Sequence, residues 1–98
     1  MDTVNTFELD ENIWEFPCEF PLKVMGPNHA PLEEVILRIV QTYVDGFNSS
    51  HISTKPSRTG KYKSLTAIIQ FSDKTQVIGV YTELAKHQEE TDHISLVL

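Results

Sequence analysis

The sequence predicts a single α+β domain with the element order β-α-β-β-α-β. Two observations predict it. In several short stretches apolar and polar residues alternate, as in strands with one buried face, and in two longer stretches apolar residues recur every three or four positions, as in helices. The 98 residues fit one small domain. Residues 19–98 are predicted to form that domain, and residues 1–18 an acidic, aromatic N-terminal arm.

The first strand and the first helix are predicted at residues 19–25 and 31–45. "EFPLKVM" alternates apolar and polar positions, and "GPNHA" after it is typical of a turn. Pro31 suits the first helical position, and Gly46 is expected to end the helix in the left-handed conformation. The apolar stripe of this helix consists of Leu32, Val35, Ile36, Ile39, Val40 and Tyr43.

Residues 48–57 and 61–72 are predicted to be two strands joined across "SRTG", with Gly60 at positive φ. A second helix is expected to start after Ser72 or Asp73, with Gln76 in the capping-box position. Its buried stripe is predicted to consist of Val77, Tyr81 and Leu84, with help from Ile78, Val80 and Ala85.

Two further expectations concern packing near the C-terminus. Gly79, in the middle of the second helix, predicts close packing against a neighbouring backbone. Residues 93–98 are predicted to form the last strand, with Ile94, Leu96 and Leu98 on its buried face.

This element order in so short a chain favours a ferredoxin-like fold, a four-stranded antiparallel sheet with both helices on one face. The opposite face of the sheet then has no covering element within the domain, and its mixed composition invites a partner. The residues predicted to point outward on this open face are Lys23, Met25, Tyr62, Ser64, Thr66, Ile68, Gln70, His93, Ser95 and Val97.

Charge and targeting signals indicate a soluble, cytoplasmic protein. The formal net charge is -6, and residues 1–19 carry six acids and no Lys or Arg. The N-terminus has no basic region followed by an apolar one, so no signal peptide is expected, and no apolar run is long enough for a membrane span. The single cysteine, Cys18, fits a reducing compartment and is interpreted as a packing residue.

The sequence shows no catalytic constellation and no metal site, and we predict neither enzymatic activity nor a cofactor. The four histidines lack metal-ligand spacing. Ser49, Ser50 and His51 are neighbours on a predicted strand, where adjacent side chains point to opposite faces. His87 is explained by the negative end of its helix dipole.

The stretch "KPSRTGKYKS" holds four of the eight basic residues. It is not a nucleotide-binding loop, because Tyr62 follows Gly60-Lys61 where Ser or Thr is required and a strand comes next instead of a helix. Nucleic acid is disfavoured because a basic stripe and the aromatic motif of RNA-binding sheets are both missing. We predict a protruding hairpin whose contact surface consists of Lys55, Arg58, Lys61, Tyr62 and Lys63.

The combination of "FPLKVMG", "KPSRTGKYKS", "VYTEL" and a terminal "LVL" resembles the YbeD-like family of small bacterial proteins of unknown function. The resemblance implies an ACT-like ferredoxin fold and a regulatory role through small-molecule binding, through self-association as a dimer, or through both. By analogy with ACT domains, the candidate ligand-binding residues are Gly26, Asn28 and His29, although this loop has no carboxylate to hold an amino group. The alternative is an adaptor whose basic hairpin binds an acidic protein or nucleic acid.

Overall fold

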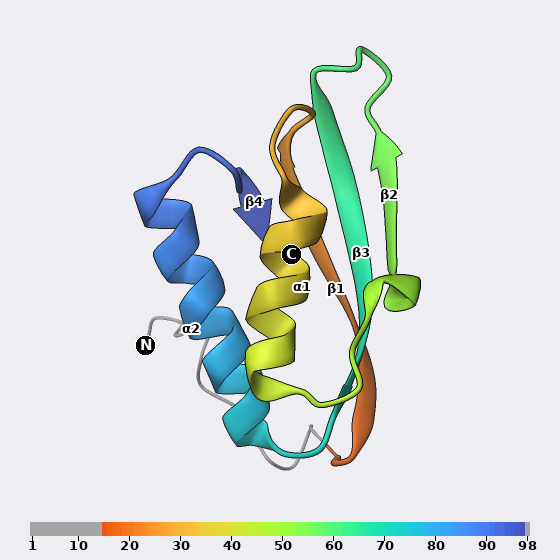
Figure 1. The fold of residues 1–98 in the computed structure, drawn as a ribbon, viewed down its shortest axis with the longest axis vertical. Coiled ribbons are helices and arrows are strands. Elements are labelled where there is room, and N and C mark those ends of the chain that lie inside the picture. The colour runs from red at the N-terminus through yellow and green to blue at the C-terminus, as the bar shows by residue number, and fades with distance from the viewer. Residues whose placement is uncertain (1–14, 98) are drawn as a thin grey trace.

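The computed structural model describes residues 15–97, and the elements within them follow the predicted order (Figure 1). The predicted arm lies mostly in residues 1–14, and these and Leu98 are outside the described residues. The elements are β1 (Cys18–Pro27), α1 (Leu32–Tyr43), the 3₁₀ turn η1 (Ser49–His51), β2 (Ile52–Pro56), β3 (Tyr62–Phe71), α2 (Lys74–Glu90) and β4 (Leu96–Val97).

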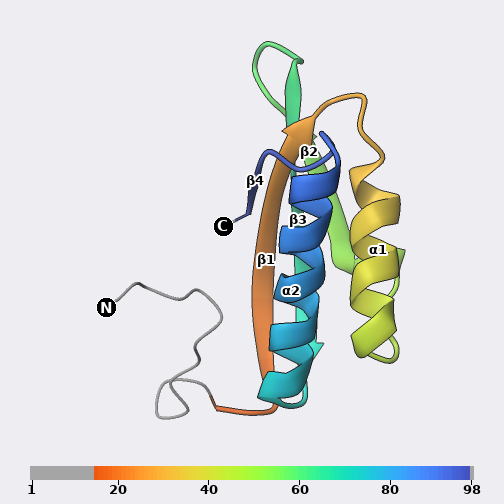
Figure 2. The ribbon, with the colours of Figure 1, turned by 90° about the vertical axis from the view of Figure 1, so that its left-hand side faces the viewer.

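The four strands form one antiparallel sheet in the order β2-β3-β1-β4. β1 and β3 pair along their full length, from Cys18 opposite Phe71 to Pro27 opposite Tyr62. Both helices lie on the same face of this sheet, and among the described residues no helix covers the other face (Figure 2). The predicted ferredoxin-like fold is confirmed.

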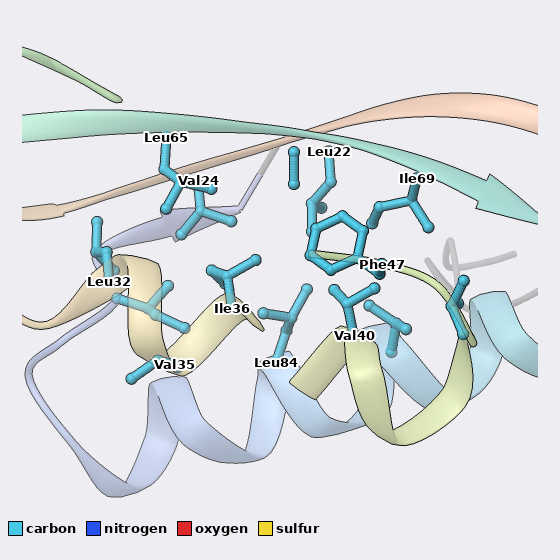
Figure 3. Close-up of a cluster of buried hydrophobic side chains, with 14 of the residues drawn as sticks. Leu22, Val24, Leu32, Val35, Ile36, Val40, Phe47, Leu65, Ile69 and Leu84 are labelled. Carbon is cyan, nitrogen blue, oxygen red and sulfur yellow. The ribbon is translucent and has the colours of Figure 1, made fainter. Parts of the chain in front are cut away.

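The core fills the space between the sheet and the two helices (Figure 3). Alternate residues of β1 and β3 point into it, because successive side chains of a strand point to opposite faces. The predicted stripe of the first helix is confirmed for its four fully buried members, whereas Ile39 and Tyr43 are partly buried. The largest fully buried side chains are Phe71, Leu22, Leu32, Ile36, Leu65, Ile69, Leu84, Val24, Val35, Val40 and Val80.

α1 is shorter at both ends than the predicted 31–45. Pro31 was expected at the first helical position, but it is the residue before the helix, with φ -83° and ψ 60°. The helix ends at Tyr43 because Val44 is extended and turns inward, where it is buried. Gly46 does adopt the predicted left-handed conformation, with φ 83°, but in the loop beyond the helix end.

The strand predicted at 48–57 is wrong in its first four residues, because residues 48–51 form a capped turn. The Asn48 side chain accepts a hydrogen bond from the Ser50 amide at 2.9 Å, and the Asn48 amide donates to His51 Nδ1 at 3.2 Å. Such side-chain bonds to the backbone compete with a strand ladder. His51 therefore lies in this turn and stacks on Phe47, and β2 starts only at Ile52.

α2 begins as predicted after Asp73, whose Oδ1 accepts the Gln76 amide at 3.1 Å. Gln76 completes the cap, but its Oε1 accepts the Ser72 amide, at 2.6 Å, instead of the Asp73 amide. Its Nε2 also donates to the Tyr43 carbonyl at 2.9 Å. One glutamine side chain thereby joins the start of α2 to the end of α1.

Two expectations for α2 need correction. Contrary to the prediction, Ile78 does not lie on the buried face but is 38 % exposed, because the helix directs Val77, Val80 and Leu84 at the core and turns Ile78 away from it. Gly79 is closely packed as predicted, but its neighbour is the ring of Tyr43 on α1 and not a backbone.

The last strand differs most from the prediction, because only Leu96 and Val97 pair with β1 among the described residues. Val97 pairs with Val24 and so lies on the helix-covered face, whereas Leu96 pairs with Met25 and lies on the open face. The predicted parity was therefore inverted. Ile94 is buried, but it precedes the strand, and the irregular backbone at His93 and Ser95 breaks the alternation.

Candidate functional site

The hairpin between β2 and β3 is closed by a compact turn at residues 57–61. The Ser57 amide donates to the Tyr62 carbonyl at 2.8 Å, and the Gly60 amide donates to the Ser57 carbonyl at 3.0 Å. Gly60 has φ 77°, the left-handed conformation that the sequence predicted for it. The turn projects beyond the body of the domain (Figure 1).

The structure brings the two stretches that the sequence singled out to the same end of the sheet. The Asn28 amide donates to the Lys61 carbonyl at 2.9 Å, and Gly26 and Pro27 pair with Lys63 and Tyr62. We call residues 26–29 and 55–63 together the hairpin end. No periodicity argument could have paired them, because the contact depends on the register of β1 against β3.

The candidate ligand-binding residues of this end differ in accessibility. Asn28 and His29 are exposed, but Gly26 is buried. A Cβ at Gly26 would overlap the carbonyl oxygen of His93 and lie 3.3 Å from Leu32 Cδ1. Gly26 therefore allows the β4 connection to pack closely on β1, and only Asn28 and His29 are placed to touch a ligand.

The basic residues of the hairpin end also differ in accessibility. Lys55, Arg58 and Lys61 are exposed. Lys63 lies on the helix-covered side, as its parity predicted, and its Nζ is 3.4 Å from Glu33 Oε1 in the first turn of α1. The Lys63 side chain is only 14 % exposed, so most of the available positive charge comes from the other three residues.

The open face of the sheet carries an apolar surface. Tyr62, Leu96 and Ile68 are 46 %, 45 % and 37 % exposed, and all three lie on this face. Among the described residues the fourth exposed large hydrophobic side chain is Ile78, on α2. We call this surface the open face, defined by Glu19, Pro21, Lys23, Met25, Ser53, Lys55, Tyr62, Ser64, Thr66, Ile68, Gln70 and Leu96.

β2, and the part of β1 that the described residues of β4 leave unpaired, each carry a proline that faces outward from the sheet. The Met25 carbonyl accepts the Ser95 amide, so the backbone of Pro21, four residues earlier, points to the same edge of β1. Ser57 bonds Tyr62, so its neighbour Pro56 points away from β3. Proline has no N–H to offer an added strand, and outward prolines protect sheet edges.

A histidine pair lies at the C-terminal end of α2, where the sequence indicates only the negative end of the helix dipole. His87 Nε2 and His93 Nδ1 are 3.1 Å apart. Burial, and after it the charges of His93 and Arg38, lower the pKa of His87 below its usual 6.5, while Glu90 opposes them. The six-residue spacing between His87 and His93 did not predict their contact, because the contact depends on the turn at Thr91.

Several other features bear on chemistry. Burial raises the pKa of the Cys18 thiol, in line with its interpretation as a packing residue. In residues 15–97 no three His, Cys, Asp or Glu side chains come together in a group that could hold a metal ion. None of the helices described is long and apolar enough to cross a membrane.

The fold and these surfaces define a small ferredoxin-like α+β protein with an exposed sheet face. Its residues 11–91 match the model of the DUF493 family, described as a protein of unknown function, and the chain belongs to this family. The resemblance to YbeD-like proteins is thereby confirmed.

Curated relatives are similar over most of their length. A UPF0250 protein of Nitrosomonas europaea is 37 % identical over 78 residues, which cover 80 % of this chain and 90 % of the relative. One from Paraburkholderia phytofirmans is 33 % identical, over 81 % of this chain and 89 % of the relative. One from Neisseria gonorrhoeae is 36 % identical, over 76 % of this chain and 81 % of the relative.

Proposed function

We propose that this protein is a non-catalytic, ACT-like regulatory protein that self-associates through the open face of its sheet. The observation that supports this most is the gathering of exposed apolar side chains on that face. Exposed apolar groups on a sheet without a covering layer are typical of an interaction surface. Burying them in a dimer would stabilise the complex by about 25 cal/mol for each Å² removed from water.

The open face suits a second copy better than the strand edges do. Pro21 faces outward on the unpaired part of β1 and Pro56 on β2, and the Ile52 amide is already bonded to the Ser49 carbonyl. The open face also carries Glu19 and Lys23, opposite charges that a two-fold interface can pair.

A matched pair of substitutions tests this proposal. Ile68 on the open face and Ile78 on α2 have nearly equal exposure, 37 % and 38 %. We expect the wild-type protein to have a dimer mass in light scattering, and Ile68→Ser to weaken the dimer by about tenfold or more, because each copy loses buried apolar area. Ile78→Ser should leave the dimer unchanged. A wild-type protein that is monomeric at all concentrations, or an equal effect of both substitutions, contradicts the proposal.

The small-molecule binding site of such a regulator is proposed at the hairpin end, where the exposed residues Asn28 and His29 lie next to Lys61. These groups can donate hydrogen bonds to an anionic metabolite, and the positive charge of Lys61 attracts it. A thermal melt of the full chain against a panel of metabolites, amino acids and nucleotides should reveal a compound that stabilises it. Asn28→Ala should remove that shift without changing the melting temperature of the unliganded protein by more than a degree or so.

A second candidate function is an adaptor that binds an acidic partner, and the clustering of Lys55, Arg58 and Lys61 on a projecting hairpin favours it. Changing these three residues to Gln should abolish capture of an acidic partner and leave self-association intact. Lys63 is left unchanged, since its bond to Glu33 belongs to the fold. Capture that persists in the triple variant would contradict the adaptor function.

A further inference from the structure

The contact between His87 and His93 joins the end of α2 to the segment that leads into β4. The rings are 5.2 Å apart between centroids, and the two facing nitrogens are 3.1 Å apart. A hydrogen bond at this distance needs an N–H on one nitrogen and a lone pair on the other. The pair can therefore hold one proton between the rings, but not two.

The surroundings of the pair disfavour a second positive charge. The charge of Arg38 on α1 lowers the pKa of His87, and the charge of Glu90 on α2 raises it. Glu83 and Lys86 complete the charged groups of the groove of about 370 Å³ that His87 lines, and they are of opposite sign. Asp92 precedes His93 in the connection and is exposed.

Few hydrogen bonds hold the connection and β4 against the domain, although Ile94 is buried in the core and Val97 packs against it. Thr91 Oγ1 donates to the His87 carbonyl at 3.0 Å and accepts the His93 amide at 3.1 Å. The Ser95 amide donates to the Met25 carbonyl at 2.7 Å, and Gln88 Nε2 donates to the Ser95 carbonyl at 3.1 Å. Beyond these bonds, the described part of β4 adds two ladder residues. His93 lies in the middle of this segment, so losing the hydrogen bond between His87 and His93 directly weakens the attachment of the segment.

We propose that the His87–His93 pair is a pH-sensitive latch that holds the β4 segment on the sheet and releases it when both rings are protonated. With both rings charged, two N–H groups face each other at 3.1 Å and repel. His93 then moves away, and its carbonyl leaves Gly26. Because Leu96 belongs to the open face, release also removes one apolar side chain from it. The effect on self-association rests on the proposed function, whereas the release itself does not.

The direction of the pH dependence follows from the lowered pKa of His87. At His87 the folded state binds fewer protons than the unfolded chain around the usual histidine pKa of 6.5. The contribution of the latch to stability is therefore fully present above that pH and is lost as the pH falls towards the folded pKa. Acidification should loosen the segment, and alkaline conditions should not.

Hydrogen exchange of the full-length protein tests the latch at about pH 7.5 and about pH 5.5, either side of the histidine pKa. After correction for intrinsic rates, the amides of residues 94–97 should lose protection at the lower pH, by up to about tenfold for each unit of pKa shift. A local measurement is used because it reports on this segment and not on the unfolding of the whole chain.

Histidine variants decide whether the pair causes the loss. His87→Gln keeps a hydrogen-bonding group but removes one titrating ring, so protection of residues 94–97 should become independent of pH. His93→Gln should do the same, and His51→Gln, in the turn before β2, should show the wild-type loss. The proposal is overturned if residues 94–97 stay protected at the lower pH, or if His87→Gln shows the wild-type loss. Either result can be obtained whether or not the protein self-associates.

Discussion

At the scale of single residues, the two glycines that lie beside other elements have different neighbours. A Cβ at Gly26 would overlap the backbone carbonyl of His93, whereas a Cβ at Gly79 would overlap the ring of Tyr43. A carbonyl held in a packed connection cannot move without moving the chain, but a tyrosine ring can rotate. Packing constraints therefore depend on what the neighbour is as well as on how close it lies.

We predict that Gly26→Ala is the more destabilising of the two alanine substitutions. Overpacking of this kind costs about 1–3 kcal/mol. Gly79→Ala should cost less, because alanine in the middle of a helix gains about 1 kcal/mol over glycine and offsets part of the clash. Urea unfolding of the two variants checks this, and a larger loss for Gly79→Ala would show that the Tyr43 ring is the more rigid neighbour.

At the scale of elements, the junction of the two helices depends on Gln76. Its side chain accepts the Ser72 amide and donates to the Tyr43 carbonyl, so it serves the N-terminus of α2 and the C-terminus of α1 at once. The sequence predicted the cap from the spacing of Asp73 and Gln76. The bond to Tyr43 could not be predicted, because it depends on how the helices lie against each other.

Gln76→Ala should therefore destabilise the protein by more than a cap substitution alone. The loss of two hydrogen bonds is expected to lower the free energy of unfolding by about 1–3 kcal/mol. Thr75→Ala, at the exposed neighbouring position of α2, is the control and should change the free energy of unfolding by less than about 0.5 kcal/mol. Equal unfolding curves for the two variants would contradict the bridging role of Gln76.

At the scale of the whole molecule, the strand register places the candidate surfaces. The pairing of β1 with β3 brings residues 26–29 to the hairpin, and the pairing of β4 with β1 puts Leu96 on the open face. The proposed dimer forms through the open face, and the proposed latch holds in place the β4 segment, which contributes Leu96 to that face. Light scattering of the full chain above and below the histidine pKa would therefore report on both.

Local sequence patterns are enough to predict the order of the elements, the four buried residues of the first helix stripe, a cap at Ser72 or Asp73 and the left-handed Gly46 and Gly60. These features depend on residues close in the chain, whose periodicity and turn chemistry act locally.

Five features follow only from the three-dimensional structure: the ends of α1, the turn at Asn48, the parity of β4, the burial of Gly26 and the contact of His87 with His93. Each of these depends on contacts between residues that belong to different elements, or on a local hydrogen bond that wins over a strand ladder. A one-residue change of register moves every side chain of a strand to the other face. For this reason the sequence could place a strand within residues 93–98 and still assign Leu96 and Val97 to the wrong sides.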